Sequence, residues 1–413
     1  MPPICSRMRG VRAGLVAVGA LVSASCGSAP QIESDQSLVV DEVGTVLSGC
    51  VDEFDARRDY FPAKAELEDA ELFRLTYHGS YKLLDVDAAG APGGVARYVL
   101  VQCGAPLPAE HADRIHITVP AQRLAVTHSY LQEALVLLGA VDRLVGVQRA
   151  EYAAAPEIRA GMAAGEILAV GSGHHADIEL ISALEPDAVL VYEPFFAESD
   201  RLLDLGIPVI ASSDGRETTM LGATEWMMLV ASLLNREADM AQILEETRGR
   251  YAALAERVSD IEDRPTFIVT RPYRGTWYLP GGRGSWARLI EDAGGRYVFR
   301  ADTTAAGREY PLEAVIDRAS EIDTWIGVAN ASSIGALVED EPRVAALEAV
   351  RLGSVWANDG ATTPDGYNPY WEHRLPYPDR MLADLIAALH PDRLPDHELI
   401  YMRRLPQQEG GAP

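Results

Sequence analysis

The sequence predicts an α/β protein in which two lobes are joined by a long helix and follow a β-rich extension. Two changes of pattern predict this fold class. Residues 41–122 form short alternating segments, whereas buried strands alternate with helices from Arg123 onward, a pattern typical of sheets with crossover helices. A helical stretch of about forty residues interrupts this alternation near its middle, which predicts a connector between two lobes.

The extension is predicted to contain a strand, a turn and a second strand. Residues 73–86 alternate between apolar and polar side chains, residues 89–94 are alanine, proline and glycine, and residues 96–103 are again rich in apolar side chains. Glycine and proline between two such runs are typical of a turn between paired strands.

The first lobe is predicted at residues 123–235 and the second at 264–405, with a connecting helix at 236–263 and a C-terminal tail at 406–413. In the first lobe, apolar runs predict strands at 124–127, 144–147, 188–191 and 209–211, and helices at 130–138 and from Asp177. In the second lobe they predict strands at 267–270 and 324–328, and helices at 285–293 and 379–389. The spacing of apolar residues distinguishes the two types of element, and Asn235 is expected to divide the central helical stretch.

The N-terminus has the features of an export signal at residues 1–25. Arg7, Arg9 and Arg12 precede an apolar run, residues 13–22, that is too short to span a bilayer. Small residues then precede Cys26 as in a bacterial lipobox, although Ser23 replaces the usual leucine. We therefore expect cleavage before Cys26, acylation of its thiol and a flexible tether at residues 26–40. The alternative is a secreted protein with an unmodified Cys26.

The four cysteines of the chain have separate expected roles. Cys5 leaves with the signal and Cys26 is the expected lipid anchor, so Cys50 and Cys103 are left as an even pair. In an oxidising compartment such a pair is a candidate for a disulfide.

The composition limits which classes of molecule the protein can bind. With 48% hydrophobic and 23% charged residues, the chain is ordinary for a globular protein. Its formal net charge of −25 argues against nucleic acid or anionic lipid as the main partner, because both repel an acidic surface. We expect contact with the membrane only through the lipid anchor.

Several segments resemble one protein family in content and in order. They lie at residues 135–147, 170–173, 178–187, 205–210 and 289–295. Through these segments the chain, from about residue 123 to 405, resembles the iron-siderophore and cobalamin periplasmic-binding proteins. The resemblance implies the class III periplasmic-binding fold, in which a long, rather rigid helix joins two α/β lobes.

The resemblance also implies a function. Such proteins capture a chelated metal compound, such as a ferric siderophore, cobalamin or haem, and deliver it to an ABC permease and its ATPase. On this basis we expect a lipid-anchored monomer in the periplasm or outer cell envelope. It would have no enzymatic activity, no cofactor and no resident metal.

Two glutamates are candidates for docking to the permease. In cobalamin-binding relatives, one glutamate on the rim of each lobe forms a salt bridge with a permease arginine. The matching positions here are Glu179 and Glu313, each near the start of a predicted helix. A carboxylate in the first turn also complements the helix dipole, so both glutamates have a structural alternative.

The segment 271–286 has the chemistry to bind a negatively charged chelate with an organic shell. Aromatic faces cover such a shell, and guanidinium groups pair with its oxygen atoms. The residues expected to contact the ligand are Arg271, Tyr273, Arg274, Trp277, Tyr278 and Arg283. Ser285 is either a helix cap or a further contact.

Further ligand candidates follow predicted strands or lie in late loops. They are His128, Ser129, Ser172 and Tyr192 in the first lobe, and Tyr370 and Trp371 in the second. His174 and His175 invite a metal site, but adjacent side chains point in different directions, so we expect a solvated pair.

Three other classes of protein remain as alternatives. A zinc- or manganese-binding member of the same superfamily is disfavoured because the nine histidines include no histidine-rich loop. A secreted enzyme with an interlobe active site is disfavoured because the sequence has no nucleophile elbow, phosphate-binding loop or dinucleotide fingerprint. A surface adhesin would need neither a cleft nor paired docking carboxylates.

Overall fold

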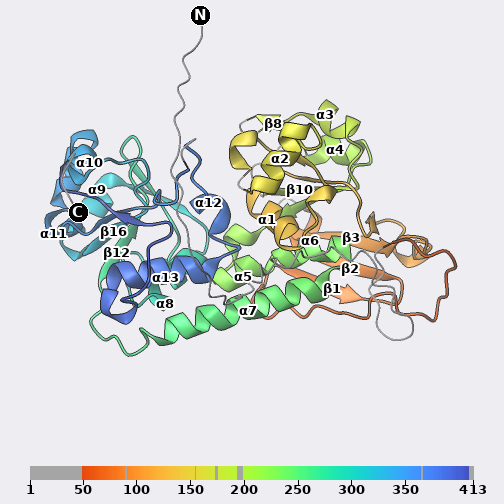
Figure 1. Cartoon of the computed structure of the whole chain (residues 1–413), viewed down its shortest axis with the longest axis horizontal. Helices are drawn as coiled ribbons and strands as arrows, with labels where there is room; N and C mark the ends of the chain where they lie inside the picture. Colours follow the sequence, from red (N-terminus) through yellow and green to blue (C-terminus); the bar gives the residue numbers. More distant parts are fainter. Residues whose placement is uncertain are drawn as a thin grey trace, which may run out of the picture. The chain divides into compact units, whose positions relative to one another are not determined.

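The computed structural model describes residues 49–88, 91–153, 155–172, 175–192, 199–363 and 366–408. Three larger sheets organise these residues (Figure 1). One sheet lies in the N-terminal extension and one in each of the two α/β lobes. The predicted fold class is therefore confirmed.

The first lobe is built on a parallel sheet with the strand order β11-β10-β5-β6-β7. Its strands are β5 (Leu124–Val126), β6 (Leu144–Val147), β7 (Leu168–Ala169), β10 (Ala188–Tyr192) and β11 (Val209–Ser212). Its helices are α1 (Ser129–Leu137), α2 (Pro156–Ala164), α3 (Ile178–Ala183) and α4 (Ser199–Asp204), and a short hairpin joins β8 (Gly171–Ser172) to β9 (His175–Ala176). Strands β5 and β6 are buried along their whole length, as is typical of parallel sheets.

The second lobe repeats this plan with the strand order β14-β12-β16-β17-β18, of which β18 is antiparallel. These strands are β12 (Thr266–Val269), β14 (Arg296–Tyr297), β16 (Thr324–Ile326), β17 (Val355–Ala357) and β18 (Arg403–Arg404). A separate antiparallel pair is formed by β13 (Thr276–Leu279) and β15 (Arg308–Pro311). The helices are α8 (Ser285–Asp292), α9 (Leu312–Ile316), α10 (Ile334–Asp340), α11 (Glu348–Leu352), α12 (Tyr370–His373) and α13 (Pro378–Leu389).

Three helices connect the lobes: α5 (Met220–Glu225), α6 (Met227–Leu234) and α7 (Glu237–Glu256), the last drawn in green in Figure 1. As predicted, Asn235 divides the helical stretch, since it ends α6 in the left-handed conformation with φ 56°. Helix α7 ends at Glu256, earlier than the predicted residue 263. Near this end the Ser259 hydroxyl donates to the Glu256 carbonyl oxygen at 2.8 Å, a local bond that competes with continued helix.

The extension forms a four-stranded sheet rather than two strands. Its strands are β1 (Phe73–Tyr77), β2 (Tyr81–Asp87), β3 (Val95–Gln102) and β4 (Ile115–Val119), paired in that order. The prediction of one strand at residues 73–86 was wrong, because the chain reverses at residues 78–80 and β1 pairs with β2. The alternation of apolar residues continues through this turn, so it conceals the reversal.

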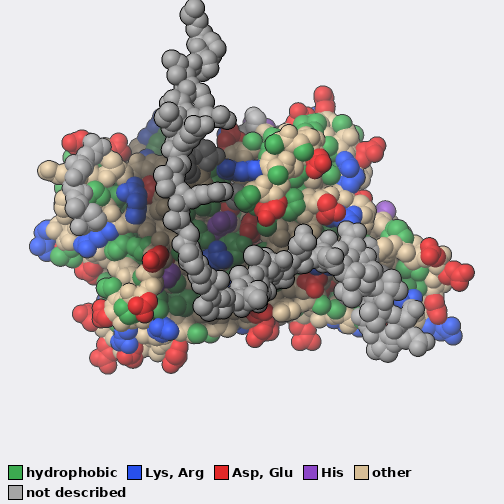
Figure 2. Space-filling model, in the orientation of Figure 1, with side chains coloured by type: hydrophobic (Ala, Val, Ile, Leu, Met, Phe, Trp, Pro, Cys, Tyr) green, Lys and Arg blue, Asp and Glu red, His purple; other side chains and the backbone are tan. Residues whose placement is uncertain are grey.

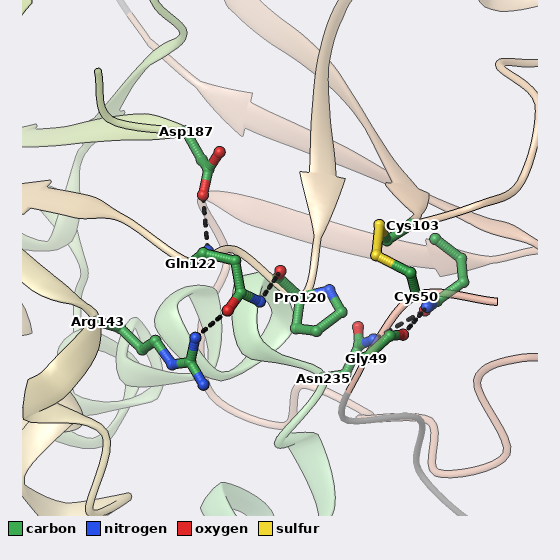
Figure 3. The surroundings of a disulfide bond; sticks show 9 residues. Gly49, Cys50, Cys103, Pro120, Gln122, Arg143, Asp187 and Asn235 are labelled. Carbon is green, nitrogen blue, oxygen red and sulfur yellow. Dashed lines mark hydrogen bonds between the residues drawn. A yellow bond between two sulfur atoms is a disulfide. The ribbon is translucent and has the colours of Figure 1, made fainter. Parts of the chain in front are cut away.

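The disulfide predicted between Cys50 and Cys103 is present, with an S–S distance of 2.00 Å (Figure 3). Beside it, the Val51 amide donates to the Cys103 carbonyl oxygen at 2.8 Å. The Gln102 side chain donates to the Gly49 carbonyl oxygen, also at 2.8 Å. The start of the described chain is thereby attached to the end of β3.

The connecting helices contribute side chains to two large hydrophobic cores, one in each lobe. The core of the first lobe also contains the extension residues Phe73, Leu84 and Tyr98, every hydrophobic residue of α6, and Met240 and Leu244 from the first half of α7. The core of the second lobe contains Met220 and Ala223 from α5 and Tyr251 from the second half of α7. The extension therefore folds as part of the first lobe.

Acidic side chains are spread over the face shown in Figure 2 and are frequent along its lower edge, where Figure 1 places α7 and α13. Within the part of the chain that the structure describes, no helix has both the length and the apolarity needed to cross a membrane.

The C-terminal strand β18 follows a turn that is held by the buried carboxylate of Asp384 in α13. This carboxylate accepts from the backbone N–H groups of Ile400, Tyr401 and Met402 at distances from 2.6 to 3.2 Å. The His397 ring also lies 2.7 Å from it. A single carboxylate thus fixes the approach of the chain to β18.

We predict that Asp384→Asn lowers the free energy of unfolding by about 2–3 kcal/mol, because an amide leaves one or more of these buried donors without an acceptor. Urea unfolding monitored by circular dichroism would measure the change. Asp396→Asn, at an exposed position of the same region, should shift it by less than about 0.5 kcal/mol. Equal effects of the two substitutions would contradict the assigned role of Asp384.

Candidate functional site

A cavity of about 450 Å³ lies between the two lobes. Its first-lobe wall contains Tyr192, the last residue of β10, and Asp214, just after β11. Its second-lobe wall contains Thr270, directly after β12. The cavity therefore lies at the carboxyl ends of strands in both sheets, where open α/β sheets bind ligands. Its volume is in the range of about 300–1,000 Å³ that is usual for small-molecule sites.

The first-lobe wall is ordered by a hydrogen-bonded group behind Tyr192. The His128 ring nitrogen Nε2 lies 2.7 Å from Oδ1 of Asp214, and the Ser212 hydroxyl donates to the same oxygen at 2.5 Å. The His128 ring is packed against Tyr192, with centroids 4.9 Å apart. The predicted ligand residue His128 is thus buried behind the cavity wall and positions Tyr192 and Asp214.

Asp214 is an ionised carboxylate in a buried position. Burial alone would raise its pKa, but the electrostatic interaction and hydrogen bond with His128, together with the hydrogen bond from Ser212, lower the pKa below its ordinary value. Next to it, Gly215 lies so close to Tyr192 that a Cβ atom there would be 2.3 Å from the Tyr192 hydroxyl oxygen. A side chain at position 215 would therefore displace Tyr192 from the wall.

The second-lobe wall contains a strained residue. Thr270 has φ 60°, a conformation that β-branched residues rarely adopt. The indole N–H groups of two buried tryptophans hold it: Trp325 donates to the Thr270 carbonyl oxygen, and Trp277 donates to the Thr270 hydroxyl at 3.1 Å. The packing of these tryptophans maintains the strained backbone at the edge of the cavity.

Arg374 is the basic side chain that connects the two walls. Its guanidinium lies 4.8 Å from the ring of Tyr130 in the first lobe and 5.9 Å from the ring of Trp286 in the second. Burial alone would lower the pKa of Arg374, but nearby tyrosines and Asp214 raise it. Arg374 therefore remains a cation within a largely aromatic environment.

The segment around Arg374 also contacts the first lobe at two other points and the connecting helix α5 at one. The Tyr377 hydroxyl donates to the Glu133 carboxylate at 2.6 Å, and the Thr224 hydroxyl donates to the Leu375 carbonyl oxygen at 2.6 Å. The Arg159 guanidinium lies 4.7 Å from the ring of Tyr367. Residues 367–377 of the second lobe thus pack against the first lobe and α5, and Arg374 and Leu375 of this segment line the cavity.

Only part of the predicted ligand set lines the cavity. Tyr192 and Tyr278 do so, as does Ser285 at the first position of α8. Ser129 begins α1 next to His128 and is not among the lining residues. Ser285 makes no side-chain cap, because Gly284 occupies the N-cap position.

The arginine-rich segment forms an exposed hairpin. Tyr273 and Thr276 exchange backbone hydrogen bonds across a two-residue turn in which Arg274 and Gly275 both have positive φ, 51° and 81°. The predicted contacts Arg271, Tyr273, Arg274 and Arg283 are exposed and are not among the lining residues. Tyr278 links this hairpin to the cavity, since it lines the cavity while 51% of its surface is exposed.

Two predicted ligand residues, Trp277 and Tyr370, are buried and do not line this cavity. Trp277 is fully buried and donates to the Val269 carbonyl oxygen at 2.9 Å, so it supports the core. The alternation along β13 turns Trp277 inward and Tyr278 outward. Tyr370 is 6% exposed and packs against Trp286 and Tyr401 rather than lining this cavity.

Some predictions fall outside the described parts of the chain. Cys26 lies there, and so do the side chains of Ser172 and Trp371.

Sequence reasoning missed Asp214 and Arg374, whereas Trp286 is the last residue of the segment 271–286 that was expected to bind ligand. The sequence position of Asp214 could have indicated a site residue, because Asp214 follows a predicted strand at the same sheet edge as Tyr192. Nothing in the sequence around Arg374 indicated a site residue, since the fold brings it to Tyr130 from a distant segment.

The two docking candidates are both exposed, in the first turns of α3 and α9. Glu313 already has a partner within the chain, because Arg343 donates to it at 2.6 Å. Asp177, two residues before Glu179, caps α3 by accepting from the Leu180 amide. The surface position of each glutamate is compatible with docking, but Arg343 would have to exchange partners.

Among the described residues, no group of three or more His, Cys, Asp or Glu side chains comes together in a way that would hold a metal ion.

The two lobes and the cavity between them define a two-lobed solute-binding protein. The chain belongs to the periplasmic binding protein family, whose model matches residues 124–360. Two uncharacterized lipoproteins of Methanocaldococcus jannaschii are similar to it. One is 23% identical over 243 residues, and that match covers 57% of this chain and 56% of the relative, little more than half its length. The other is 24% identical over 339 residues, covering 78% and 82%.

Solved structures of bacterial proteins share the fold. A periplasmic haem-binding protein of Pseudomonas aeruginosa has a TM-score of 0.53 and 19% identity, covering 70% of this chain and all of that one. A periplasmic binding protein of Veillonella parvula has a TM-score of 0.55 and 13% identity, covering 76% and 99%. A Helicobacter pylori protein with Ni(II) bound has a TM-score of 0.52 and 16% identity, covering 68% and 88%. Family membership and the lipoprotein relatives indicate an extracytoplasmic location.

The buried Glu372 beside the cavity predicts a pH effect on stability. Burial raises its pKa from 4.5 to about 7, although a hydrogen bond from Tyr367 opposes the shift. The fold therefore favours the protonated form, and this contribution is present below pH 4.5 and is lost as the pH rises through about 7. Glu372→Gln stays neutral, so its stability relative to the parent should rise between pH 5 and 8 by an amount on the order of 2 kcal/mol.

Urea unfolding at several pH values from 5 to 8 would measure this difference. Glu339→Gln, at an exposed position, provides the matched control and should show a constant difference from the parent. A constant difference for Glu372→Gln as well would contradict the raised pKa.

Proposed function

We propose that this chain is the substrate-binding component of an ABC importer and that the interlobe cavity holds a chelated metal compound. The observation that carries the proposal is the cavity itself. It combines aromatic surfaces from Tyr192, Tyr278 and Trp286 with the guanidinium of Arg374. Aromatic faces bind the organic shell of a chelate, and a partly buried guanidinium pairs with its oxygen atoms.

The exposed hairpin extends this proposal beyond the cavity. Tyr273 is 60% exposed, and the guanidinium of Arg274 lies 5.0 Å from its ring. In this proposal a ferric siderophore, haem or cobalamin would fill the cavity and extend from it toward the hairpin. Arg271, Tyr273, Arg274 and Arg283 would contact the outer part of such a ligand. Lipidation at Cys26 would keep the protein near its permease and raise the local concentration at which the two meet.

Binding of defined probes tests the proposal. Ferrioxamine B, haemin and cyanocobalamin would be titrated against the purified protein by isothermal calorimetry, together with zinc and manganese ions. We expect at least one chelate to bind more tightly than either bare ion. Binding of the bare ions alone would favour the zinc and manganese branch, and absence of any binding would remove the present proposal.

Arg374→Met tests the role of the Arg374 guanidinium in the cavity. It should weaken binding of the chelate found above by about tenfold or more, equivalent to about 1.4 kcal/mol, because an oxygen of the ligand loses a charged donor. Arg351→Met, at an exposed position of α11, is the control and should leave the affinity unchanged. Calorimetry on both variants measures the effect, and equal affinities would exclude Arg374 from the site.

Glu179→Lys and Glu313→Lys together test docking to the permease. We expect the double variant to bind the chelate with unchanged affinity but to lose transport, because lysine repels a permease arginine. Uptake of radiolabelled chelate by cells that express the importer would measure transport. Normal uptake by the double variant would end the docking proposal.

A further inference from the structure

The N-terminal extension lies outside the segment, residues 124–360, that matches the periplasmic binding protein family. Its described part begins at Gly49 and ends with β4 at Val119. This part does not line the cavity between the lobes. Many of its polar contacts are instead with the helices that connect the two lobes and with the residues just before them, although Tyr98 also donates to the Val209 carbonyl oxygen in β11.

Lys82 of β2 makes the most deeply buried of these contacts. Its side chain is fully buried, and its ammonium group lies 2.5 Å from the Glu237 carboxylate, at the start of α7. The same group donates to the Ser232 carbonyl oxygen in α6 at 2.6 Å and to the Asn235 side chain at 2.8 Å. One charge from the extension therefore holds both sides of the α6–α7 junction.

Asn235 ties the same junction to β3. Its side-chain amide donates to the Gln102 side chain at 2.9 Å, and Gln102 donates in turn to the Gly49 carbonyl oxygen. Cys103, next to Gln102, is joined to Cys50 by the disulfide. The left-handed residue between α6 and α7 is thus bonded to a covalently closed part of the extension.

Two buried carboxylates form a second attachment. Glu225 of α5 accepts from the backbone amides of residues 68–70, at distances from 2.7 to 3.2 Å. Glu217, before α5, accepts from the amides of residues 71 and 72. Five consecutive N–H groups of the extension are thereby bound to the first part of the connector.

Arg248 extends this attachment to the middle of α7. It donates to Glu225 at 2.7 Å and to Asp69 at 3.1 Å. Directly after it the partners of α7 change to the second lobe, since Arg250 donates to Asp379 at 2.6 Å and Tyr251 to Asp292 at 2.9 Å. One half of α7 is bound to the extension and the other half to the second lobe.

We propose that the extension is a brace that makes α6 and the first half of α7 part of the first lobe and so restricts rotation between the lobes. A buried charge network resists bending because each displaced partner would be left unpaired in a low-dielectric interior. Without the brace, the left-handed Asn235 between two helices is the natural point at which the connector bends. The brace removes this freedom at the α6–α7 junction.

The distance between the lobes in the unliganded protein tests the proposal. Spin labels at Leu205→Cys in the first lobe and Leu352→Cys in the second, both exposed, would be placed in a chain with Cys5→Ser and Cys26→Ser. Double electron–electron resonance then gives the distribution of interlobe distances. We expect Lys82→Met and Glu225→Gln each to broaden this distribution. We also expect amide hydrogen exchange at residues 229–243 to accelerate by roughly tenfold or more, since local opening becomes easier.

Ile181→Ala is the control, because Ile181 is fully buried in a first-lobe cluster that includes no residue of the extension. It should lower the melting temperature and leave the interlobe distances unchanged. If the Lys82→Met variant does not fold, the Glu225→Gln variant alone provides the measurement, because glutamine has the same shape as glutamate. A narrow distribution in the brace variants, or equal broadening in Ile181→Ala, would overturn the proposal and leave the extension a purely stabilising part.

Discussion

The buried ion pair of Lys82 and Glu237 is the constraint on which the arrangement of the extension, the connector and the first lobe depends. A fully buried ammonium group is tolerated only where several acceptors surround it. Here they come from a helix end, a left-handed residue and a helix start, namely Ser232, Asn235 and Glu237. Lys82 therefore requires β2 to meet both helices in one position. The shared hydrophobic core then fixes the first-lobe sheet against the same elements.

The walls of the candidate site are held in place by the hydrophobic cores of the two lobes. Each wall of the cavity is formed where strands end, and each end is fixed by groups behind it. His128 and Ser212 hold Asp214 on one side, and Trp277 and Trp325 hold the strained Thr270 on the other. Arg374 lies between the walls, over an aromatic ring from each lobe. The site therefore combines preorganised polar groups with aromatic surface, as small-molecule sites generally do.

The helices and strands whose apolar residues recur at a regular spacing were predicted well from the sequence. The residues of the site were predicted only in part. Strands 144–147 and 188–191 and the division at Asn235 are signalled by local apolar runs and a residue that accepts positive φ. The hairpin at residues 271–283 shows the limit of such reasoning. Its composition indicated ligand contact throughout, yet strand alternation turns Trp277 into the core and a two-residue turn carries Arg274 outward. The turn at residues 78–80 was missed because alternation of apolar residues has the same appearance on either side of it.

The sequence by itself determined the fold class, the order of the lobes and the even pair of extracytoplasmic cysteines, because each of these follows from local pattern or residue count. It also placed Tyr192 and Tyr278 among the ligand candidates, since polar and aromatic residues next to strand ends tend to face a cleft. Only the tertiary structure decided that Asp214 and Arg374 share a cavity and that Lys82 holds the connector. These contacts join segments more than a hundred residues apart. Long-range packing selects such partners, and no spacing within one segment encodes them.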